Sequence, residues 1–223
     1  MLNSNTRLLI LSPHPDDEIL GCGGLMNKIN KIGGENHVVV FTYGDAVDVP
    51  DIRKQEFEKV MKYMNVSSHK CLYSNQFHLR LDQIPMFNII QEIEKILRAI
   101  RPTICAIPYP SFNQDHRVVY EAAIGALRIP SIIGVNDSIN VLIYEYPQIA
   151  WNVYSRAFEP NIFIDISDEI GQKLHAFNIY ESQMKTQKHA ISSSGIQKLA
   201  SMRGLSISEE YAEAYILKRG IIK

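Results

Sequence analysis

The sequence predicts an α/β fold of the Rossmann-like kind, a three-layer α/β/α arrangement around a mostly parallel sheet. Short runs of Val, Ile and Leu alternate along the chain with stretches in which apolar residues recur at helical spacing. Strands that are apolar throughout are typical of a parallel sheet with helices on both faces. The chain has 223 residues, which is enough for one such domain and few for two. We therefore predict a single domain over residues 1–223.

Each predicted element has its own signal in the chain. Uninterrupted apolar runs predict strands, at residues 7–11, 37–43, 70–73, 103–107, 140–146 and 161–166. Apolar residues that recur about every 3.6 positions predict helices, at residues 18–32, 52–64, 84–100, 114–128, 167–185 and 208–218. Ser208 is a suitable N-cap for the last of these helices, whereas residues 192–195 indicate a loop. In folds of this kind, ligands bind at the carboxyl ends of the strands.

The composition argues against several classes of function. A net charge of −1 provides no field that would attract nucleic acid or an anionic membrane. No apolar run reaches the roughly 18 residues of a membrane span, and the N-terminus lacks the features of a signal peptide. The three cysteines, Cys22, Cys71 and Cys105, fit neither a disulfide framework nor a zinc knuckle. We expect a cytoplasmic protein, and a homo-oligomer is compatible with the sequence.

The segment SPHPDDE, residues 12–18, lies between the first predicted strand and the first predicted helix. Pro13 and Pro15 stiffen this turn, so His14 and one carboxylate can share a metal while the other carboxylate stays free. An imidazole with a carboxylate suits zinc, and a free carboxylate beside metal-bound water can act as a general base. The structural alternative is a polar turn whose acids stabilise the helix N-terminus. The run His-Pro-Asp-Asp at a strand end favours the metal site.

The second motif, Asn113-Gln114-Asp115-His116, follows the strand at residues 103–107 and opens a predicted helix. This is again the carboxyl end of a strand, where His116 can supply the third ligand of an open zinc site. Asp115 is a candidate to hold a nearby polar group in place. Alone, the motif is more typical of an Asp N-cap turn with a surface histidine. Its pairing with residues 14–17 reverses that preference.

Other candidates in the chain are weaker. The segment Gly21-Cys22-Gly23-Gly24 lacks the G-x-G-x-x-G spacing of a dinucleotide loop and indicates close helix packing. The remaining histidines, at positions 37, 69, 78, 175 and 189, are expected to be structural or solvated. Glu18 belongs to the first turn of its helix, from which it could orient His14.

Both motifs resemble signatures of the PIG-L/LmbE-like deacetylase family. Residues 14–18 match its His-Pro-Asp-Asp-Glu segment, and residues 113–116 match its second signature, a short His-x-Asp-His segment. Weaker resemblances cover nearly the whole chain, at residues 53, 56, 180–183, 202–204 and 211–215. The resemblance implies a zinc-dependent N-deacetylase.

The resemblance also implies a role for each matched side chain. His14, Asp17 and His116 match the metal ligands. Asp16 matches the general base that deprotonates the metal-bound water, and Asp115 matches the carboxylate paired within the second motif.

Asn113 departs from the family pattern, which often has a histidine at this position that is thought to stabilise the oxyanion. Asn113 can donate a neutral hydrogen bond to the oxyanion but cannot be a cation. The form Asn-Gln-Asp-His resembles a branch associated with carbohydrate and surface-polysaccharide deacetylases. On this basis Asn113 is a candidate catalytic residue.

The expected reaction removes the acetyl group from an N-acetylated amino sugar or its conjugate, with Zn²⁺ or another divalent metal as cofactor. Arg53 and Arg80, with Arg128 and Arg203, are candidates to bind a substrate phosphate or carboxylate, although a surface charge or a helix-end partner is the more typical role of each. An amidase acting on a thiol-precursor conjugate or a non-sugar amide would use the same metal chemistry. The chain lacks the Gly-rich fingerprint of a nucleotide-binding module, which argues against that function. The presence of Asp16 argues against a metal-binding regulator that has lost catalysis.

Overall fold

The sheet is the centre of the fold. The computed structural model describes residues 2–44, 51–128, 139–150 and 158–221. Its sheet has the strand order β3-β2-β1-β4-β5-β7-β6. The strands are β1 (Arg7–Ser12), β2 (Glu35–Val40), β3 (Ser68–Cys71), β4 (Ile104–Pro108), β5 (Asn140–Tyr144), β6 (Ile162–Asp165) and β7 (Ala212–Arg219). The strands from β1 to β5 are parallel, while β7 runs antiparallel to both β5 and β6.

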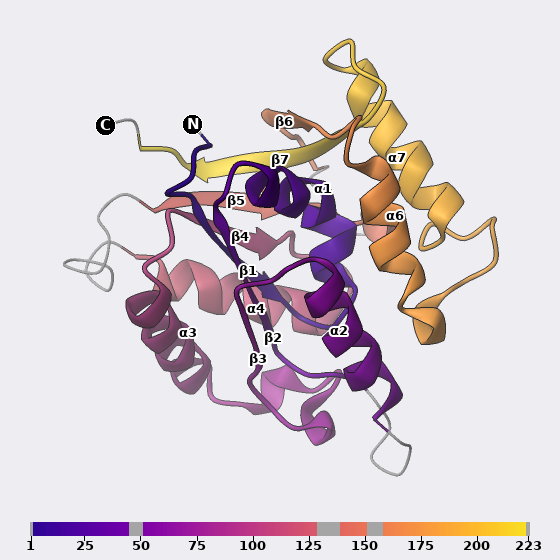
Figure 1. Cartoon of the computed structure of the whole chain (residues 1–223). Helices are drawn as coiled ribbons and strands as arrows, with labels where there is room; N and C mark the ends of the chain where they lie inside the picture. Colours follow the sequence, from indigo (N-terminus) through magenta and orange to yellow (C-terminus); the bar gives the residue numbers. More distant parts are fainter. Residues whose placement is uncertain (1, 45–50, 129–138, 151–157, 222–223) are drawn as a thin grey trace.

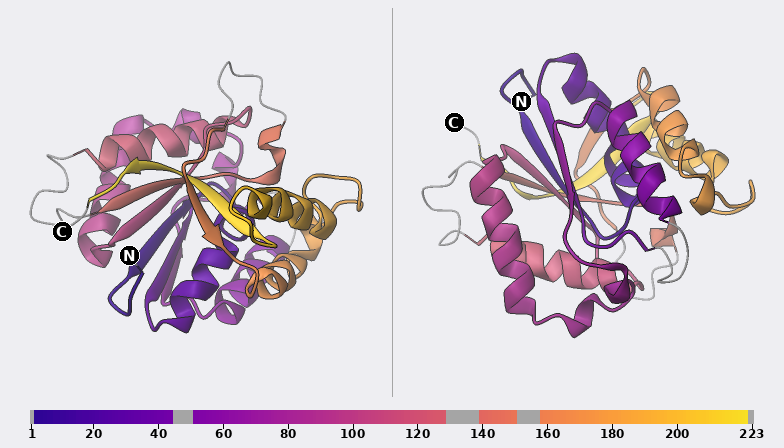
Figure 2. Two further views of the ribbon diagram at one scale, coloured as in Figure 1. Left: turned by 90° about the horizontal axis from the view of Figure 1, so that it is seen from above. Right: turned by 60° about the horizontal axis from the view of Figure 1, so that its bottom comes forward.

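Helices cover both faces of this sheet (Figures 1 and 2). One face packs against α3 (Met86–Ile100) and α4 (Gln114–Ala126), and the other against α1 (Asp17–Lys31), α2 (Ile52–Tyr63), α6 (Ile170–Asn178) and α7 (Ser193–Leu205). Short 3₁₀ turns lie at η1 (Asn75–Phe77), η2 (Leu81–Gln83), η3 (Pro147–Ala150) and η4 (Glu181–Gln183). The predicted three-layer, mostly parallel α/β fold is therefore confirmed.

Strand β1 shows why its sequence forms a buried central strand. Successive side chains of a strand point to opposite faces. Accordingly, Leu8 and Ile10 join the core under α1, while Leu9 and Leu11 join the core under α3 and α4. All four side chains are fully buried, so an uninterrupted apolar run is required here, as the sequence pattern predicted.

The strand order places the two sequence motifs beside each other. β1 pairs with β2 on one side and with β4 on the other, so β1 and β4 flank the point where the order of the sheet reverses. Residues 12–18 leave the carboxyl end of β1, and residues 109–113 leave the carboxyl end of β4. The carboxyl ends of strands at such a point form the usual ligand crevice of an open α/β sheet.

The C-terminal elements differ from the prediction. The helix expected at residues 208–218 is wrong, because residues 212–219 form strand β7 between β5 and β6. Ser208 has φ 62° and caps no helix. The loop expected at residues 192–195 instead opens α7, where the Ser192 hydroxyl accepts from the backbone N–H of Gly195. The helix predicted at 167–185 is shorter, at Ile170–Asn178.

Among the described helices, none has the length and apolarity that crossing a membrane requires. All described strands belong to one sheet. The assignment of residues 1–223 to a single domain stays a prediction.

Candidate metal centre

The turn between β1 and α1 is strained and is held by buried hydrogen bonds. Asp16 has φ 105° and ψ −33°, a region that costs a non-glycine residue free energy. The buried Glu18 carboxylate accepts from the Asp16 backbone N–H at 3.1 Å and from the Ser12 hydroxyl at 3.3 Å. Tyr180 donates to the other oxygen of Glu18 at 2.5 Å. These bonds fix the backbone from which the side chains of residues 14–17 project.

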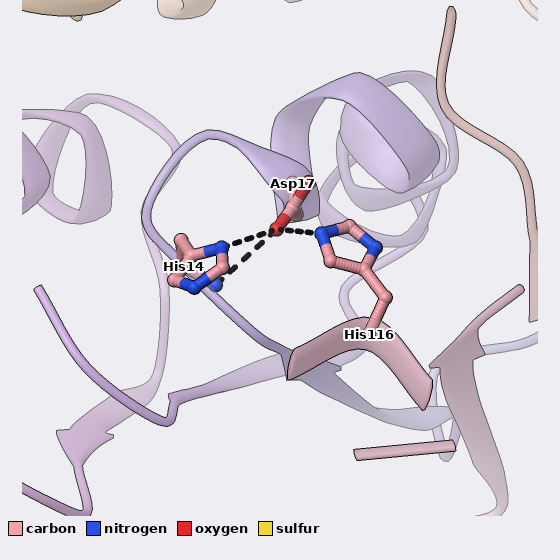
Figure 3. Close-up of side chains that lie close together, drawn as sticks. All are labelled: His14, Asp17 and His116. Carbon is pink, nitrogen blue, oxygen red and sulfur yellow. Dashed lines mark hydrogen bonds and ion pairs between the residues drawn. The ribbon is translucent and has the colours of Figure 1, made fainter. Parts of the chain in front are cut away.

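Three side chains of the two motifs meet at one place (Figure 3). Asp17 Oδ2 lies 3.6 Å from His14 Nδ1 and 3.3 Å from His116 Nε2. One potential ligand atom from each residue lies within 4.8 Å of the others, and all three residues are buried. His14 comes from the turn, Asp17 from the first turn of α1 and His116 from α4. The predicted metal set is therefore assembled in space.

The chemistry of these donors fits a divalent cation. His14 Nε2 lies 3.0 Å from Asp115 Oδ2, and that carboxylate also accepts from the backbone N–H groups of Leu79 and Leu81. If the neutral ring donates its Nε2 proton to Asp115, Nδ1 presents a lone pair to the Asp17 carboxylate. Two acceptors in a buried site repel unless a proton or a cation lies between them. Two imidazoles and one carboxylate, with a carboxylate behind one imidazole, are typical of zinc.

The pKa shifts of Asp17 and His14 also indicate that this site favours a positive charge. Burial opposes ionisation of Asp17, but the rings of His116 and His14 outweigh it and lower its pKa. Burial lowers the pKa of His14, but the hydrogen bonds with Asp115 and Asp17 outweigh it and raise that pKa. Asp17 therefore favours its ionised form, and His14 holds a proton more tightly than a free imidazole does.

Asp16 and Arg53 form the adjoining wall of the site. Arg53 lies 3.4 Å from Asp16 Oδ1 and donates to the Pro15 carbonyl oxygen at 2.7 Å. Burial raises the pKa of Asp16; the Arg53 guanidinium opposes this effect, and the carboxylates of Asp17 and Glu18 add to it. Arg53 thus supports the motif itself, while its predicted contact with substrate stays a prediction.

The other arginines differ in what they contact. Arg80 is exposed, so its side chain is available to a ligand. Arg128 pairs with Glu94 at 3.1 Å, and Arg203 pairs with both carboxylate oxygens of Glu145 at 2.6 and 2.7 Å. The last two arginines therefore already have carboxylate partners.

The residues of the second motif separate into two roles. Asn113 is the N-cap of α4, because its Oδ1 accepts from the Asp115 backbone N–H at 2.9 Å. Asp115 supports His14, as described above. The cap is therefore Asn113 rather than an aspartate, and His116 is buried rather than at the surface. The cap does not use the amide hydrogens of Asn113.

Two neighbours of the metal ligands were missed by the sequence analysis. Tyr146 packs on His116, with ring centroids 4.6 Å apart, and donates to Ser111 Oγ at 2.6 Å. His78 packs edge-on against His14, with centroids 4.7 Å apart. Burial, followed by the charges of His14 and Arg53, lowers the pKa of His78 to about 4. Tyr146 lies just after the carboxyl end of β5, and this position could have indicated that it belongs to the site. His78 lies in a polar loop, where the sequence has no such signal.

The chain is similar to known deacetylases. A diacetylchitobiose deacetylase of Thermococcus kodakarensis is 24% identical over 230 residues, covering 98% of this chain and 85% of that protein. A probable N-acetyl-α-D-glucosaminyl L-malate deacetylase of Bacillus cereus is 23% identical, covering 79% of this chain and 83% of that protein.

Solved structures show the same fold with low sequence identity. The N,N'-diacetylchitobiose deacetylase of Pyrococcus horikoshii has a TM-score of 0.75 and 23% identity, covering 94% of this chain and 82% of that one. The 4-carboxy-2-hydroxymuconate hydratase of Pseudomonas putida has a TM-score of 0.78 and 16% identity, covering 98% of both chains. These likenesses establish the fold, and proteins with different reactions share it.

The family model described as GlcNAc-PI de-N-acetylase matches residues 9–127. This match spans more than half of the chain and includes both motifs, with all three potential metal ligands. The chain therefore belongs to the PIG-L family, the PIG-L/LmbE-like deacetylases that its two motifs resemble.

Proposed function

We propose that this protein is a zinc-dependent hydrolase that removes the acetyl group from an N-acetylated amino sugar or from a conjugate of one. The observation that carries the proposal is the buried set His14, Asp17 and His116 beside the acid Asp16. Membership of the PIG-L family supports a deacetylase. The relatives whose names specify diacetylchitobiose and N-acetylglucosaminyl malate support an amino sugar as substrate.

The three ligands and Asp16 divide the work of an amide hydrolysis. A divalent cation held by His14, Asp17 and His116 would supply Lewis acidity, which polarises the acyl carbonyl and acidifies water. Asp16 would accept the proton of the attacking water and later deliver it to the leaving amine. Burial raises the pKa of Asp16 to about 8, and Arg53, 3.4 Å away, opposes this shift and so favours the ionised form that a base requires.

Two further residues support this chemistry. Asp115 holds the ring of His14 through Nε2 and so leaves Nδ1 for the metal. Asn113 uses its amide oxygen as a helix cap, and its amide hydrogens could donate to the oxygen that becomes negative during attack. An amidase acting on a thiol-precursor conjugate or a non-sugar amide would need the same residues, so the substrate must be found by assay.

The experiment measures acetate release and bound metal on the same preparations. The panel contains diacetylchitobiose, N-acetylglucosaminyl malate, a nucleotide-linked N-acetylamino sugar and N-acetylated amino acids. Wild type should hold one zinc per chain and release acetate from at least one sugar. Chelation should abolish that release, and zinc should restore it.

Matched variants separate the ligand from the base. Asp16→Asn should keep most of the metal and lose about 10²- to 10⁴-fold in kcat, whereas Asp17→Asn, His14→Ala and His116→Ala should lose metal. Undiminished zinc in both histidine variants would contradict the metal site. Equal activity on amino acids and sugars would instead favour the general amidase.

A further inference from the structure

His78 lies at the candidate site but takes no part in the proposed metal binding or proton transfer. Its ring packs edge-on against that of His14, at 4.7 Å between centroids and 76° between planes. It does not belong to the set formed by His14, Asp17 and His116. His78 also comes from a different part of the chain, directly after η1.

The surroundings of His78 leave one edge of its ring available. Nδ1 lies 3.4 Å from the Thr42 hydroxyl, and Gly44 packs against the same side of the ring. A Cβ at Gly44 would come within 2.9 Å of the His78 ring and 2.6 Å of an Arg53 nitrogen, so glycine allows these two side chains to approach. Among the described residues, no hydrogen-bond partner is found for Nε2, and the residue is only partly buried.

The backbone around His78 is fixed to the metal site itself. Leu79 and Leu81 donate their backbone N–H groups to Asp115 at 2.8 and 3.1 Å, and Asp115 holds His14 at 3.0 Å. A side chain that is positioned in advance in this way loses little conformational freedom when a ligand binds. The backbone that carries His78 is therefore held beside the candidate metal site.

A second metal bound by His78, His14 and Asp115 is the competing interpretation, because these three residues also cluster. Asp115 argues against it. Its two oxygens already accept from His14 Nε2 and from two backbone N–H groups. A metal bound through His14 Nε2 would replace the hydrogen bond to Asp115 and release the ring that the first site needs.

We propose that His78 contacts the substrate by hydrogen-bonding a ring hydroxyl of the amino sugar, and that this contact favours sugars over simple acetamides. The proposal rests on the deacetylase function proposed above. An imidazole nitrogen can donate to or accept from a hydroxyl, which is itself both donor and acceptor. A site built to bond a hydroxyl discriminates against analogues that lack it, because its own polar group is then left unpaired.

The experiment compares wild type, His78→Ala and His78→Gln, with His69→Ala as the control. His69 is exposed on β3 and pairs with Glu58. The substrates are diacetylchitobiose, its analogues that lack single ring hydroxyls, and N-cyclohexylacetamide, which has an acetamide on a ring without hydroxyls. Bound zinc is measured for every variant.

His78→Ala should lose about 10- to 100-fold in kcat/KM on the sugar and should match wild type on N-cyclohexylacetamide, with zinc unchanged. One deoxy analogue should react equally with wild type and His78→Ala, which identifies the bonded hydroxyl. His78→Gln should recover part of the loss. Equal losses on all substrates, or lost zinc, would show that His78 only positions His14 and would overturn the proposal.

A binding measurement separates this proposal from the proposed function. If wild type releases no acetate from any sugar, the deacetylase function fails. Calorimetric titration of diacetylchitobiose into the zinc-loaded proteins then tests His78 alone. Weaker binding to His78→Ala than to wild type supports the contact, and equal or absent binding refutes it.

Discussion

Asn113 has a structural role as a helix cap, and a chemical role for the same side chain is part of the proposed function. Its backbone is extended, with φ −71° and ψ 123°, and its Oδ1 accepts from the Asp115 N–H at 2.9 Å. This is the geometry of an N-cap, a position where asparagine is among the favoured residues. Capping uses only the amide oxygen. The amide nitrogen therefore stays a candidate donor to the substrate, at the position where the family pattern often has a histidine.

Two substitutions of Asn113 separate the cap from the donor. Asn113→Ala should lower the free energy of unfolding by about 0.5–2 kcal/mol, because the cap is lost, and should lower kcat by about 10²- to 10³-fold. Asn113→Asp retains a capping oxygen but has no amide hydrogens, so it should keep the stability and lose a similar factor in kcat. Unfolding curves, kcat and zinc content are measured on the same preparations. A destabilised but fully active Asn113→Ala would rule out the oxyanion role.

At the residue scale, the sequence predicts which side chains could bind a metal better than it predicts which side chains contact one another. His14, Asp17 and His116 could be grouped because short motifs follow two strands whose carboxyl ends share an edge of the sheet. The contact between Arg53 and Asp16 could not be predicted in this way. It depends on how α2 packs beside the turn, and no local pattern around position 53 encodes that packing.

At the scale of elements, the turn from β1 to α1 depends on a buried acid. Asp16 adopts φ 105°, a conformation that costs about 1–3 kcal/mol for a residue other than glycine. Glu18 offsets this cost through its bonds with the Asp16 N–H and the Ser12 hydroxyl, and Tyr180 ties it to the segment after α6. Burial, opposed by hydrogen bonds such as that from Tyr180, raises the pKa of Glu18 to about 7.

The raised pKa of Glu18 predicts a pH-dependent stability of the metal-free protein. A carboxyl that binds its proton more tightly in the folded state contributes stability that is present below its unfolded pKa near 4.5. That contribution is lost as the pH rises through about 7. Between these pH values, wild type should lose up to about 3 kcal/mol relative to Glu18→Gln, which cannot titrate. Urea unfolding of both proteins at several pH values measures the difference, and parallel profiles would contradict the prediction.

Strand β7 shows why one element could not be predicted from its own residues. Residues 212–219 (AEAYILKR) contain good helix formers, and local propensity favours a helix there. The strand forms because β5 and β6 pair with its two edges. Its Glu213 is buried, where it bonds Lys173 at 2.6 Å and the backbone N–H groups of Gly24 and Leu25. These partners are distant in sequence, so tertiary packing decides the conformation.

At the scale of the whole molecule, the metal ligands come from both layers of helices. His14 and Asp17 belong to the junction of β1 and α1, and α1 packs on one face of the sheet. His116 belongs to α4, which packs on the other face. A bound metal would therefore connect the two layers of helices at the carboxyl ends of β1 and β4. Its binding free energy would then stabilise the folded protein as a unit.

Metal binding should compete with protonation of His14, because the pKa of His14 is raised in the metal-free protein. The folded protein then holds a proton on His14 more tightly than the unfolded chain does. That contribution is present below the unfolded pKa near 6.5 and is lost as the pH rises through the raised pKa. Zinc must displace this proton, so its affinity should increase with pH over the same interval.

Adding zinc should therefore raise the Tm more at pH 8 than at pH 6. A ligand at 1,000 times its Kd stabilises the folded state by about 4 kcal/mol, so several degrees are expected at the higher pH. Calorimetry with and without zinc measures the effect. Arg80→Ala, at an exposed position outside the ligand set, should respond like wild type, while His116→Ala should respond little. An equal rise in Tm at both pH values, or the same rise in His116→Ala, would contradict a metal that joins the layers through these ligands.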